Sequence, residues 1–397
     1  MSPISRSKLL TKSLLSLVIF ISFGVFVSDV FAVGFRMWER TNGNIMVTAG
    51  NANNSVIAGD YLYVAGFTTN TNYRTVGRVE KRLRSNGELV SSFGNGGVYL
   101  YDLGTTGNVM FHSITAYNDD VYVAGYSEDN SGTLRWIYGR ISGNAGVLIW
   151  GNWQYYSGEV YDFPSRISTN EATVINVSSN GIYIAGRADD YWRIIKVGES
   201  GGDPYKENTF DGDGQVLGAW KSRPSTLKVE GSDFYVIGSE NSYAYYDNQW
   251  RIEKRNLISG SLDASFDSDG VINYRGNDDF YNGYYATAAV LNGSGGLFVS
   301  GINGSDGYWV TRKYRTSDGA IVTTFGDSND NSYQGINNLG VFDIGVDGNT
   351  GDLLIPSADR DSNNYYWLLE KRSGVTGNII WSQKGDYVLG TEVGQPL

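Results

Sequence analysis

The six residues "DFYVIG" (233–238) recur along the chain, and this recurrence decides the fold. A turn residue, a short apolar strand and a small closing residue appear again at five places: "YLYVAG" (61–66), "DVYVAG" (120–125), "GIYIAG" (181–186), "GLFVSG" (296–301) and "DLLIPS" (352–357). Successive closing residues lie 52 to 63 positions apart. Self-similarity at such a period is typical of repeat architectures.

Each copy holds four candidate strands in a constant order. A modestly apolar strand such as "ATVINV" (172–177) comes first, and the six-residue pattern is the second. A third strand opens with an aromatic residue, as in "WRIEKR" (250–255), and a glycine turn leads to a fourth, as in "GVINY" (270–274). Both faces of "DVYVAG" are apolar or small, which predicts a strand that is covered on both sides. In "WRIEKR", polar residues alternate with apolar ones, which predicts one face in contact with solvent.

Four strands of graded exposure in about 58 residues predict one blade of a β-propeller. Sandwich domains need about 100 residues each. We therefore predict an all-β fold, a β-propeller of six full four-stranded repeats plus an N-terminal half repeat. The half repeat is residues 35–50, which resemble the second half of a copy at 367–381. Either a six-bladed ring with an extra hairpin or a seven-bladed ring with one incomplete blade fits this count, and the second is preferred.

The first 32 residues have the layout of a secretory signal peptide. Arg6, Lys8 and Lys12 precede an apolar run over 14–27, and "VFA" (30–32) offers a cleavage site. The alternative is an uncleaved membrane anchor, but the run is shorter than the roughly 20 residues of a spanning helix. We expect cleavage near Ala32, which leaves residues 33–397 as a single propeller domain without a membrane span. The mature protein is expected to be secreted, extracellular or held in the cell envelope.

The composition of the chain limits the kinds of partner that it can bind. The formal net charge of the chain is −11, and the leader is basic, so the mature chain is more acidic still. An acidic surface repels phosphate, which makes nucleic acid an unsuitable partner. The chain has no cysteine, so an exported domain of this kind must be held together by its core. We expect a monomer that binds a glycan or a protein ligand.

A further motif connects the third and fourth strands. It reads "GELVSSFGNGGV" (87–98) and "GSLDASFDSDGV" (260–271), with partial copies at "FDGDGQV" (210–216) and "GAIVTTFGDSND" (319–330). Together with the "YVAG" strands, the motif resembles the delta-60 repeat of secreted bacterial propellers over nearly all of the mature chain. That resemblance implies a propeller fold and carries no catalytic residues. The second and sixth copies lack the Phe-Gly turn, so their blades depart from the family pattern.

The loops between second and third strands are polar in every copy and should open on one face of the ring. Carboxylates beside aromatic rings could bind a sugar or a cationic ligand there, although Asn, Asp and Gly are also ordinary turn residues. The candidate ligand-binding residues on this face are Glu128, Asp129, Asp189, Asp190, Tyr191, Asp247, Asp306, Tyr308, Asp359 and Asp361.

Closely spaced aspartates are candidates for calcium binding, because carboxylate oxygens suit a hard cation. Asp211 and Asp213 lie in "FDGDG", and Asp267 and Asp269 lie in "FDSDG". The sister copy "FGNGG" (93–97) has no carboxylate, so the shared requirement is a turn with Gly96 or Gly270 at positive φ. No cofactor is expected, and Ca²⁺ is the alternative. The next candidates for calcium are Asp327, Asn329 and Asp330 in "DSNDNS".

Nucleophilic catalysis is poorly supported. His112 is the single histidine, so a Ser-His-Asp triad would have to use it, and a structural role is expected instead. Without cysteine, a zinc site of the His/Cys kind cannot be built. Paired carboxylates for glycoside cleavage stay open because acidic residues are abundant. "AGVLIW" (145–150) and "TGNIIW" (376–381) resemble the tryptophan docking motif of quinoprotein propellers, which implies a quinone-dependent redox protein.

The aromatic residue that opens the third strand predicts packing between neighbouring blades, because equivalent positions repeat it: Trp136, Trp192, Trp250, Trp309 and Trp367. The sequence therefore favours an exported, non-enzymatic binding or structural module. The two alternatives are a carbohydrate-active propeller and a quinone-dependent redox propeller.

Overall fold

The structure is all-β. The computed structural model describes residues 50–151, 170–188, 191–200, 203–220, 222–241, 248–275, 284–303, 308–326, 332–334, 341–361 and 364–384. These residues contain no helix, so none of them forms a helix that could cross a lipid bilayer. Their strands pair antiparallel in six sheets, which follow one another along the chain.

The first three sheets correspond to the first three sequence copies. The first sheet consists of β1 (Asn51–Ala58), β2 (Tyr61–Thr69), β3 (Thr75–Leu83) and β4 (Val98–Tyr101). The second consists of β5 (Gly107–Tyr117), β6 (Asp120–Asp129), β7 (Leu134–Ser142) and β8 (Leu148–Gly151). The third has five strands, since two share its outer position: β9 (Glu171–Ser178), β10 (Gly181–Ala188), β11 (Tyr191–Ser200), β12 (Asp203–Lys206) and β13 (Gln215–Trp220).

The last three sheets repeat the same order. The fourth consists of β14 (Ser222–Glu230), β15 (Asp233–Asn241), β16 (Asn248–Asn256) and β17 (Val271–Tyr274). The fifth consists of β18 (Tyr285–Leu291), β19 (Gly296–Asn303), β20 (Tyr308–Arg315) and β21 (Ser332–Gln334). The sixth consists of β22 (Gly345–Val346), β23 (Leu353–Asp361), β24 (Asn364–Arg372) and β25 (Ile379–Lys384).

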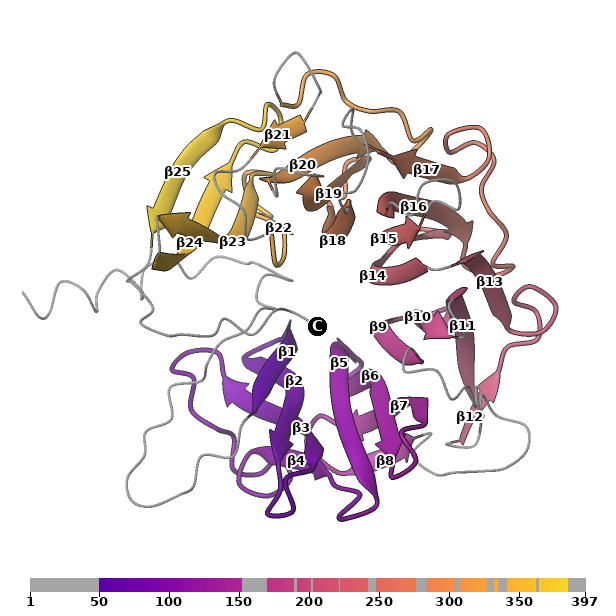
Figure 1. The fold of residues 1–397 in the computed structure, drawn as a ribbon, viewed down its shortest axis with the longest axis vertical. Coiled ribbons are helices and arrows are strands. Elements are labelled where there is room, and N and C mark those ends of the chain that lie inside the picture. Colours follow the sequence, from indigo (N-terminus) through magenta and orange to yellow (C-terminus); the bar gives the residue numbers. More distant parts are fainter. Residues whose placement is uncertain are drawn as a thin grey trace, which may run out of the picture.

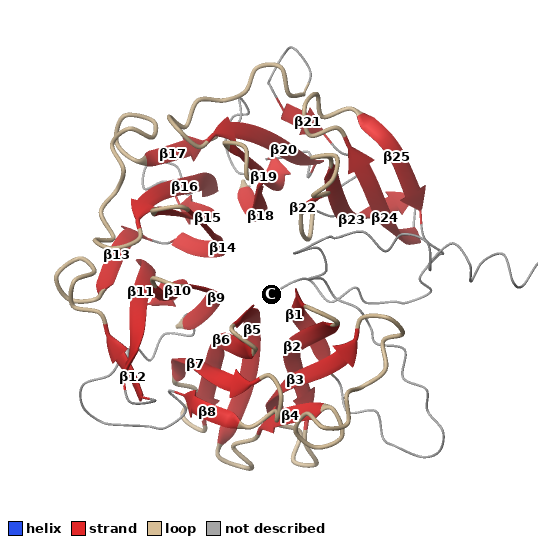
Figure 2. Ribbon diagram, turned by 180° about the vertical axis from the view of Figure 1, so that it is seen from behind, coloured by secondary structure: helices blue, strands red, loops and turns tan. Residues whose placement is uncertain are grey.

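The sheets stand around a common centre, as in a β-propeller. Figure 1 shows the first strand of each sheet (β1, β5, β9, β14, β18 and β22) nearest the centre and the last strand at the rim, and Figure 2 shows the same order from behind. The prediction of an all-β fold built from four-stranded repeats is confirmed. The half repeat at 35–49 lies outside the described residues, so the number of blades stays a prediction.

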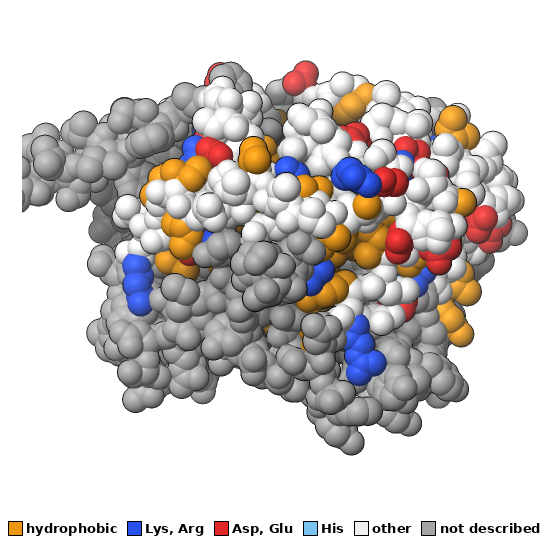
Figure 3. Space-filling view, turned by 90° about the horizontal axis from the view of Figure 1, so that it is seen from above, with side chains coloured by type: hydrophobic (Ala, Val, Ile, Leu, Met, Phe, Trp, Pro, Cys, Tyr) orange, Lys and Arg blue, Asp and Glu red, His pale blue; other side chains and the backbone are white. Residues whose placement is uncertain are grey.

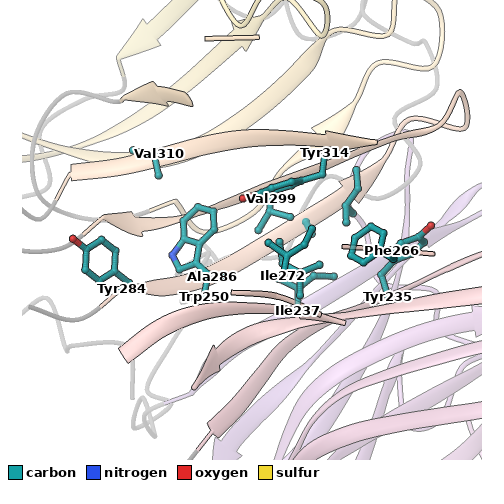
Figure 4. Close-up of a cluster of buried hydrophobic side chains, with 13 residues drawn as sticks. Tyr235, Ile237, Trp250, Phe266, Ile272, Tyr284, Ala286, Val299, Val310 and Tyr314 are labelled. Carbon is teal, nitrogen blue, oxygen red and sulfur yellow. The ribbon is translucent and has the colours of Figure 1, made fainter. Parts of the chain in front are cut away.

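Five clusters of buried apolar side chains join the sheets in sequence. Each cluster lies between one sheet and the next, and Figure 4 shows the one between the fourth and fifth sheets, with Trp250 and Tyr235 facing Ala286 and Val299. Burial of these faces is the main stabilising term, because a four-stranded sheet alone cannot cover them. Among the described residues, no such cluster joins the sixth sheet to the first.

Four of the five recurring tryptophans lie within these clusters, as predicted. Trp136, Trp192, Trp250 and Trp309 are almost fully buried. Trp250 donates its indole N–H to the carbonyl of Ile302 in the next sheet, at 3.1 Å. The backbone of Trp367 lies in β24, and its side chain is outside the described residues.

The glycine that closes the six-residue pattern is required by a β-bulge. Innermost strands carry one extra residue opposite this glycine; in the second sheet the register shifts between Phe111 and Ser113, facing Gly125. A Cβ on Gly125 would lie 1.9 Å from the carbonyl oxygen of Met110, so no side chain fits. In the sixth sheet, where Ser357 replaces the glycine, the described residues show an isolated bridge between Val341 and Ser357, and the amide of Phe342 donates to the carbonyl of Pro356 at 3.2 Å.

The Phe-Gly or Phe-Asp motif forms a clamp between sheets. Each phenylalanine is fully buried, and the residue after it has a positive φ and donates its amide to a turn of the next sheet. The four clamps are Gly94 to Ala145 at 2.8 Å, Asp211 to Ser259 at 2.8 Å, Asp267 to Asp318 at 2.9 Å and Gly326 to Thr376 at 3.0 Å. The motif therefore serves sheet-to-sheet contact as well as the turn.

The prediction of a solvent-facing side on "WRIEKR" is wrong. Glu253 is fully buried and is paired with Arg251 and Arg255, at 2.6 Å in both cases. The preceding sheet lies against this face, because the sheets of the ring stack on one another (Figure 1). Two arginines neutralise one buried carboxylate, so polar alternation here marks an ion-paired interface.

Candidate functional site at the ring centre

The extra residues of the innermost strands form a chain of hydrogen bonds around the centre. Each side chain donates to a backbone carbonyl of the next innermost strand. The four donors are Asn53 to Phe111 at 2.7 Å, Thr173 to Pro224 at 2.6 Å, Ser225 to Ala286 at 2.7 Å and Thr287 to Val341 at 2.8 Å. We call these side chains and His112 of the second sheet the bulge ring.

His112 occupies the bulge position of β5 and makes a different contact. Its Nε2 lies 3.2 Å from Oε2 of Glu171, the first residue of β9 in the third sheet. The other oxygen of Glu171 lies 3.0 Å from Nη2 of Arg223, the second residue of β14 in the fourth sheet. Three neighbouring sheets thus contribute an imidazole, a carboxylate and a guanidinium to one group.

Two further residues border this group from β6. The Tyr126 ring lies 5.5 Å from the His112 ring, measured between centroids. Burial raises the pKa of Tyr126, and the charges of Glu128 and Glu171 add to that effect. Glu128 accepts a hydrogen bond from the Asn108 side chain at 2.9 Å. We call His112, Tyr126, Glu171 and Arg223 the His112 cluster.

Glu171 is held as a carboxylate. Burial is the largest single effect and raises its pKa, but the close approach of His112 and the charges of Arg223 and Arg187 outweigh it. The pKa of Glu171 therefore lies below its ordinary value. The side chains of His112 and Glu171 are 19% exposed and that of Arg223 is 40% exposed, although Nε2 of His112, the atom that faces Glu171, is itself buried.

This arrangement has recognisable chemistry. A carboxylate that orients an imidazole is the pair that general-base catalysis uses, and an accessible arginine can bind a carboxylate or a developing negative charge. The described residues contain no group of three or more His, Asp or Glu side chains arranged to bind a metal.

Among the predicted acidic-face side chains that the structure describes, Glu128 lies near Tyr126 of the cluster. Asp129 caps its own turn, accepting the amides of Ser131 at 2.8 Å and Thr133 at 3.0 Å. The hydrogen bond from the Ser131 side chain is the main cause of the lowered pKa of Asp129. For Asp129 the ordinary turn interpretation therefore holds.

The structure describes the other predicted acidic-face residues only in part. Tyr191 is half-buried at the start of β11. Asp189, Asp190, Asp247 and Asp306 lie outside the described residues, and for Tyr308, Asp359 and Asp361 the backbone is described but the side chain is not. Their role in ligand binding stays a prediction.

The calcium candidates occupy exposed turns. Asp213 and Asp269 each accept the amide two residues further on, in Gln215 at 3.1 Å and Val271 at 2.8 Å. Asp211 and Asp267 have positive φ. Gly96 (φ 63°) and Gly270 (φ 87°) adopt the conformation predicted for them. Asp327, Asn329 and Asp330 lie outside the described residues.

The tryptophan of "AGVLIW" has a packing role. Trp150 lies edge-on to Tyr122 and Tyr138, and its indole N–H donates to Glu199 of the third sheet at 2.7 Å. The equivalent Trp381 in β25 is half-buried. The resemblance to a docking motif is thus explained in the second sheet by contact between sheets.

The predicted acidic surface is not apparent on the face that Figure 3 shows. Acidic and basic side chains alternate over its described part, with small groups of apolar side chains between them. Much of the negative charge is paired, as between Arg140 and both Asp120 and Glu199, at 2.6 Å each.

Sequence reasoning missed Glu171, Arg223 and Tyr126 as site residues. A signal was present: His112 lies thirteen positions before its closing glycine, as do Asn53, Thr173 and Ser225. Glu171 and Arg223 both lie fifteen positions before theirs. Aligning the copies would have shown equivalent positions, on neighbouring innermost strands, that change from apolar or amide side chains to charged ones.

One comparison with a solved structure, at a TM-score of 0.50, supports the fold. No protein family model and no curated sequence matches the chain. Among solved structures, a periplasmic gluconolactonase of Pseudomonas aeruginosa is 17% identical with a TM-score of 0.50, over 87% of this chain and 86% of that one. A Bacteroides fragilis protein provisionally assigned as a 6-phosphogluconolactonase is 13% identical (TM-score 0.49; 85% of each chain). The β-propeller domain of the Pyrococcus furiosus trilobed protease is 9% identical (TM-score 0.43; 89% and 99%).

Proposed function

We propose that this protein is an exported β-propeller that binds and hydrolyses a sugar-derived cyclic ester at the His112 cluster. One observation carries the proposal: the bulge ring is broken at a single described position, where an imidazole, held by a carboxylate, takes the place of a hydroxyl or amide. A purely structural ring would have no need of that change, since Thr173 and Thr287 fill the same place with short hydrogen bonds.

The chemistry of lactone hydrolysis suits the cluster. Attack of water on the ester carbonyl needs a base to remove a proton and a positive group to stabilise the oxyanion. His112, oriented by Glu171, takes the proton from the attacking water, and Arg223 supplies the positive charge that stabilises the oxyanion. As the ester C–O bond breaks, the imidazolium of His112 returns the proton to the leaving ring oxygen, which gives the open-chain hydroxy acid. Tyr126 offers a ring against which the apolar face of a sugar can lie. The fold shared with a gluconolactonase makes this ester the first substrate to test, as a fold-level analogy.

The broader setting belongs to the same proposal. The repeat is of the delta-60 type, the leader is removed near Ala32, and the mature domain works outside the cytoplasm. A non-enzymatic module that only binds a glycan or a protein is the second candidate. It ranks below the enzyme because Asp129, one of the predicted ligand residues, already accepts hydrogen bonds from its own turn. Cleavage of glycosides by paired carboxylates and a quinone-dependent activity stay predictions.

The test is hydrolysis of gluconolactone by the mature chain, followed by acid release at constant pH and corrected for the spontaneous reaction. His112→Thr is the informative variant, because threonine is the native residue at two equivalent positions. We expect it to fold normally and to lose activity by about 10²-fold or more, as for removal of a general base.

Asp213→Asn is the matched control, since Asp213 is an exposed turn carboxylate away from the cluster. Its activity should equal that of the unaltered protein. A folded His112→Thr protein with full activity would exclude the cluster as the catalytic site. Sugar binding without acid release, lost in Arg223→Gln, would favour the binding module.

A further inference from the structure

The two sheets at the ends of the described chain each leave one face incompletely covered. In the fourth sheet, Tyr235, Ile237 and Ile252 face the fifth sheet and are fully buried. The equivalent residues of the sixth sheet, Leu354, Pro356 and Leu369, are half-buried.

The first sheet shows the same pattern on its opposite face. Phe234 and Val236 of the fourth sheet face the third sheet and are fully buried. Their equivalents in the first sheet, Leu62 and Val64, are half-buried. Figure 1 shows these two faces on either side of one sector of the ring, wider than the space between any other neighbouring sheets. An apolar layer of this chain or of a partner is therefore needed there.

The face of the first sheet also repeats an ion-paired surface that is covered elsewhere. Arg78 and Arg82 donate to Glu80 at 2.7 and 2.8 Å, as Arg251 and Arg255 do to Glu253. The side chains of Arg78 and Arg82 are 31% and 23% exposed, against 15% and 8% for the arginines of the fourth sheet.

In two of the covered interfaces, an arginine on this face of the third strand lies near an aromatic side chain of the preceding sheet: Arg312, at the position that Glu253 has in its sheet, and Arg372, at the position of Arg255. Arg312 lies 3.6 Å from the Tyr274 ring centre, and Arg372 lies 5.4 Å from that of Trp309. Arg82 is the equivalent of Arg372. The surface on the first sheet is thus shaped for a tryptophan-bearing strand.

We propose that residues 35–49 of this chain cover that face, with Trp38 packed against Gly66. Three observations select this occupant. First, the segment joins β1 directly, as each outermost strand joins the next innermost one. Second, the sequence "MWERTNGNIMV" (37–47) has the order of a third strand, a turn and a fourth strand. Third, Trp38 has the same place in this sequence as the tryptophan that opens the third strand of the other copies.

Two of the other sheets define the contact; in the third and fifth sheets, the indole N–H groups of Trp192 and Trp309 have no hydrogen-bond partner among the described residues. Trp136 and Trp250 each lie against the closing glycine of the next sheet and donate to the carbonyl just after it, in Arg187 at 2.9 Å and Ile302 at 3.1 Å. By the same geometry, Trp38 donates its indole N–H to the carbonyl of Phe67. This packing is independent of the proposed function.

The absence of cysteine makes a direct test simple. Trp38→Cys is combined with Val64→Cys in the full mature chain and treated with a short bis-maleimide. We expect an intramolecular cross-link, identified by mass spectrometry. The control pair, Trp38→Cys with Leu217→Cys, places the second thiol on an exposed residue of the third sheet and should give none.

A second measurement does not depend on the cross-linker. A thiol at Val64→Cys should react with maleimide about tenfold faster when Trp38→Ala is added, because a covered thiol reacts only through local opening. The rate for Leu217→Cys should not change. Failure to cross-link together with an unchanged rate would overturn the proposal. A cross-link between Val64→Cys and Tyr387→Cys would also overturn it, since the occupant would then be the C-terminal segment. Cross-linked dimers would overturn it as well, since the occupant would then be a second copy of the chain.

Discussion

At the scale of single residues, the tryptophan of the third strand is the clearest example of a side chain placed by its neighbours. Trp250 is fully buried, its ring lies against Gly301, and its indole N–H is paired. Any larger residue at Gly301 would strike the indole, since a Cβ there would lie 2.8 Å from Trp250 Cζ2. Large and small positions on facing sheets are thus matched one to one.

Replacing Trp250 by alanine should lower the free energy of unfolding by about 3–5 kcal/mol, as for large-to-small changes in cores. Denaturant titration measures this. Tyr205→Ala, at a side chain that is 45% exposed, is the control and should change stability by less than about 0.5 kcal/mol. Equal stability of the Trp250 variant and the unaltered protein would contradict a packing role for Trp250 between the sheets.

Gly238→Ala tests the bulge. Its Cβ would lie 2.1 Å from the carbonyl oxygen of Arg223, so the innermost strand must move. We expect a loss of about 1–3 kcal/mol, the usual cost of overpacking. Gly59→Asn is the matched control, because Gly59 has positive φ, asparagine tolerates that conformation, and no atom lies within 4 Å of the added Cβ. Comparable stability of the two variants would show that the bulge adapts easily.

At the scale of the elements, the innermost strands are joined side by side by the bulge ring. Thr287 donates to Val341 of the sixth sheet at 2.8 Å, across the sheet boundary. This bond gives the carbonyl of Val341 a hydrogen-bond donor from the neighbouring sheet. Hydroxyl, amide and imidazole side chains all fit the position, which explains how one member could change its chemistry without loss of the fold.

Thr287→Val keeps the shape of the side chain and removes the donor. The carbonyl of Val341 loses its partner, so the free energy of unfolding should fall by about 1–3 kcal/mol. Thr209→Val, on an exposed turn, is the control and should be close to neutral. A thermal melt that does not distinguish the two variants would contradict a stabilising role for the bulge ring.

The sequence predicted those elements that depend on local pattern. The "YVAG" strands, the tryptophans and the turn glycines were all foreseen, because alternation and positive φ are visible within one copy. The His112 cluster was not, since His112, Glu171 and Arg223 meet across three sheets. The burial of Glu253 was missed for the same reason: alternation of charge was interpreted as solvent contact, but the charge is paired beneath a neighbouring sheet.

At the scale of the whole molecule, stability depends on a set of tyrosines between sheets. Burial raises the pKa of Tyr63, Tyr122 and Tyr235 to about 12 in each case. Tyr63 and Tyr235 also donate to carbonyls of the next sheet, at 3.0 and 3.2 Å. Neutral phenols are therefore part of three of the interfaces.

This has a consequence for alkaline stability. An unfolded tyrosine ionises near pH 10 and these folded ones near 12, so between the two values the unfolded state releases more protons. The stabilisation is complete below about pH 10 and falls as the pH rises toward 12. Denaturant midpoints measured across this range should decrease, and the decrease should be smaller in Tyr235→Phe. A midpoint that does not change with pH would contradict the burial of these phenols.

The turn clamps all point the same way around the ring: each amide reaches from one sheet to the sheet that follows it in the chain. While the chain is being made, a newly formed first, third, fourth or fifth sheet holds a clamp donor whose acceptor does not yet exist, and it acquires that acceptor only when its successor arrives. Assembly should therefore proceed in one direction, from the N-terminal sheets onward. A product truncated after one of these sheets would leave the clamp amide without its acceptor and the apolar face beside it uncovered.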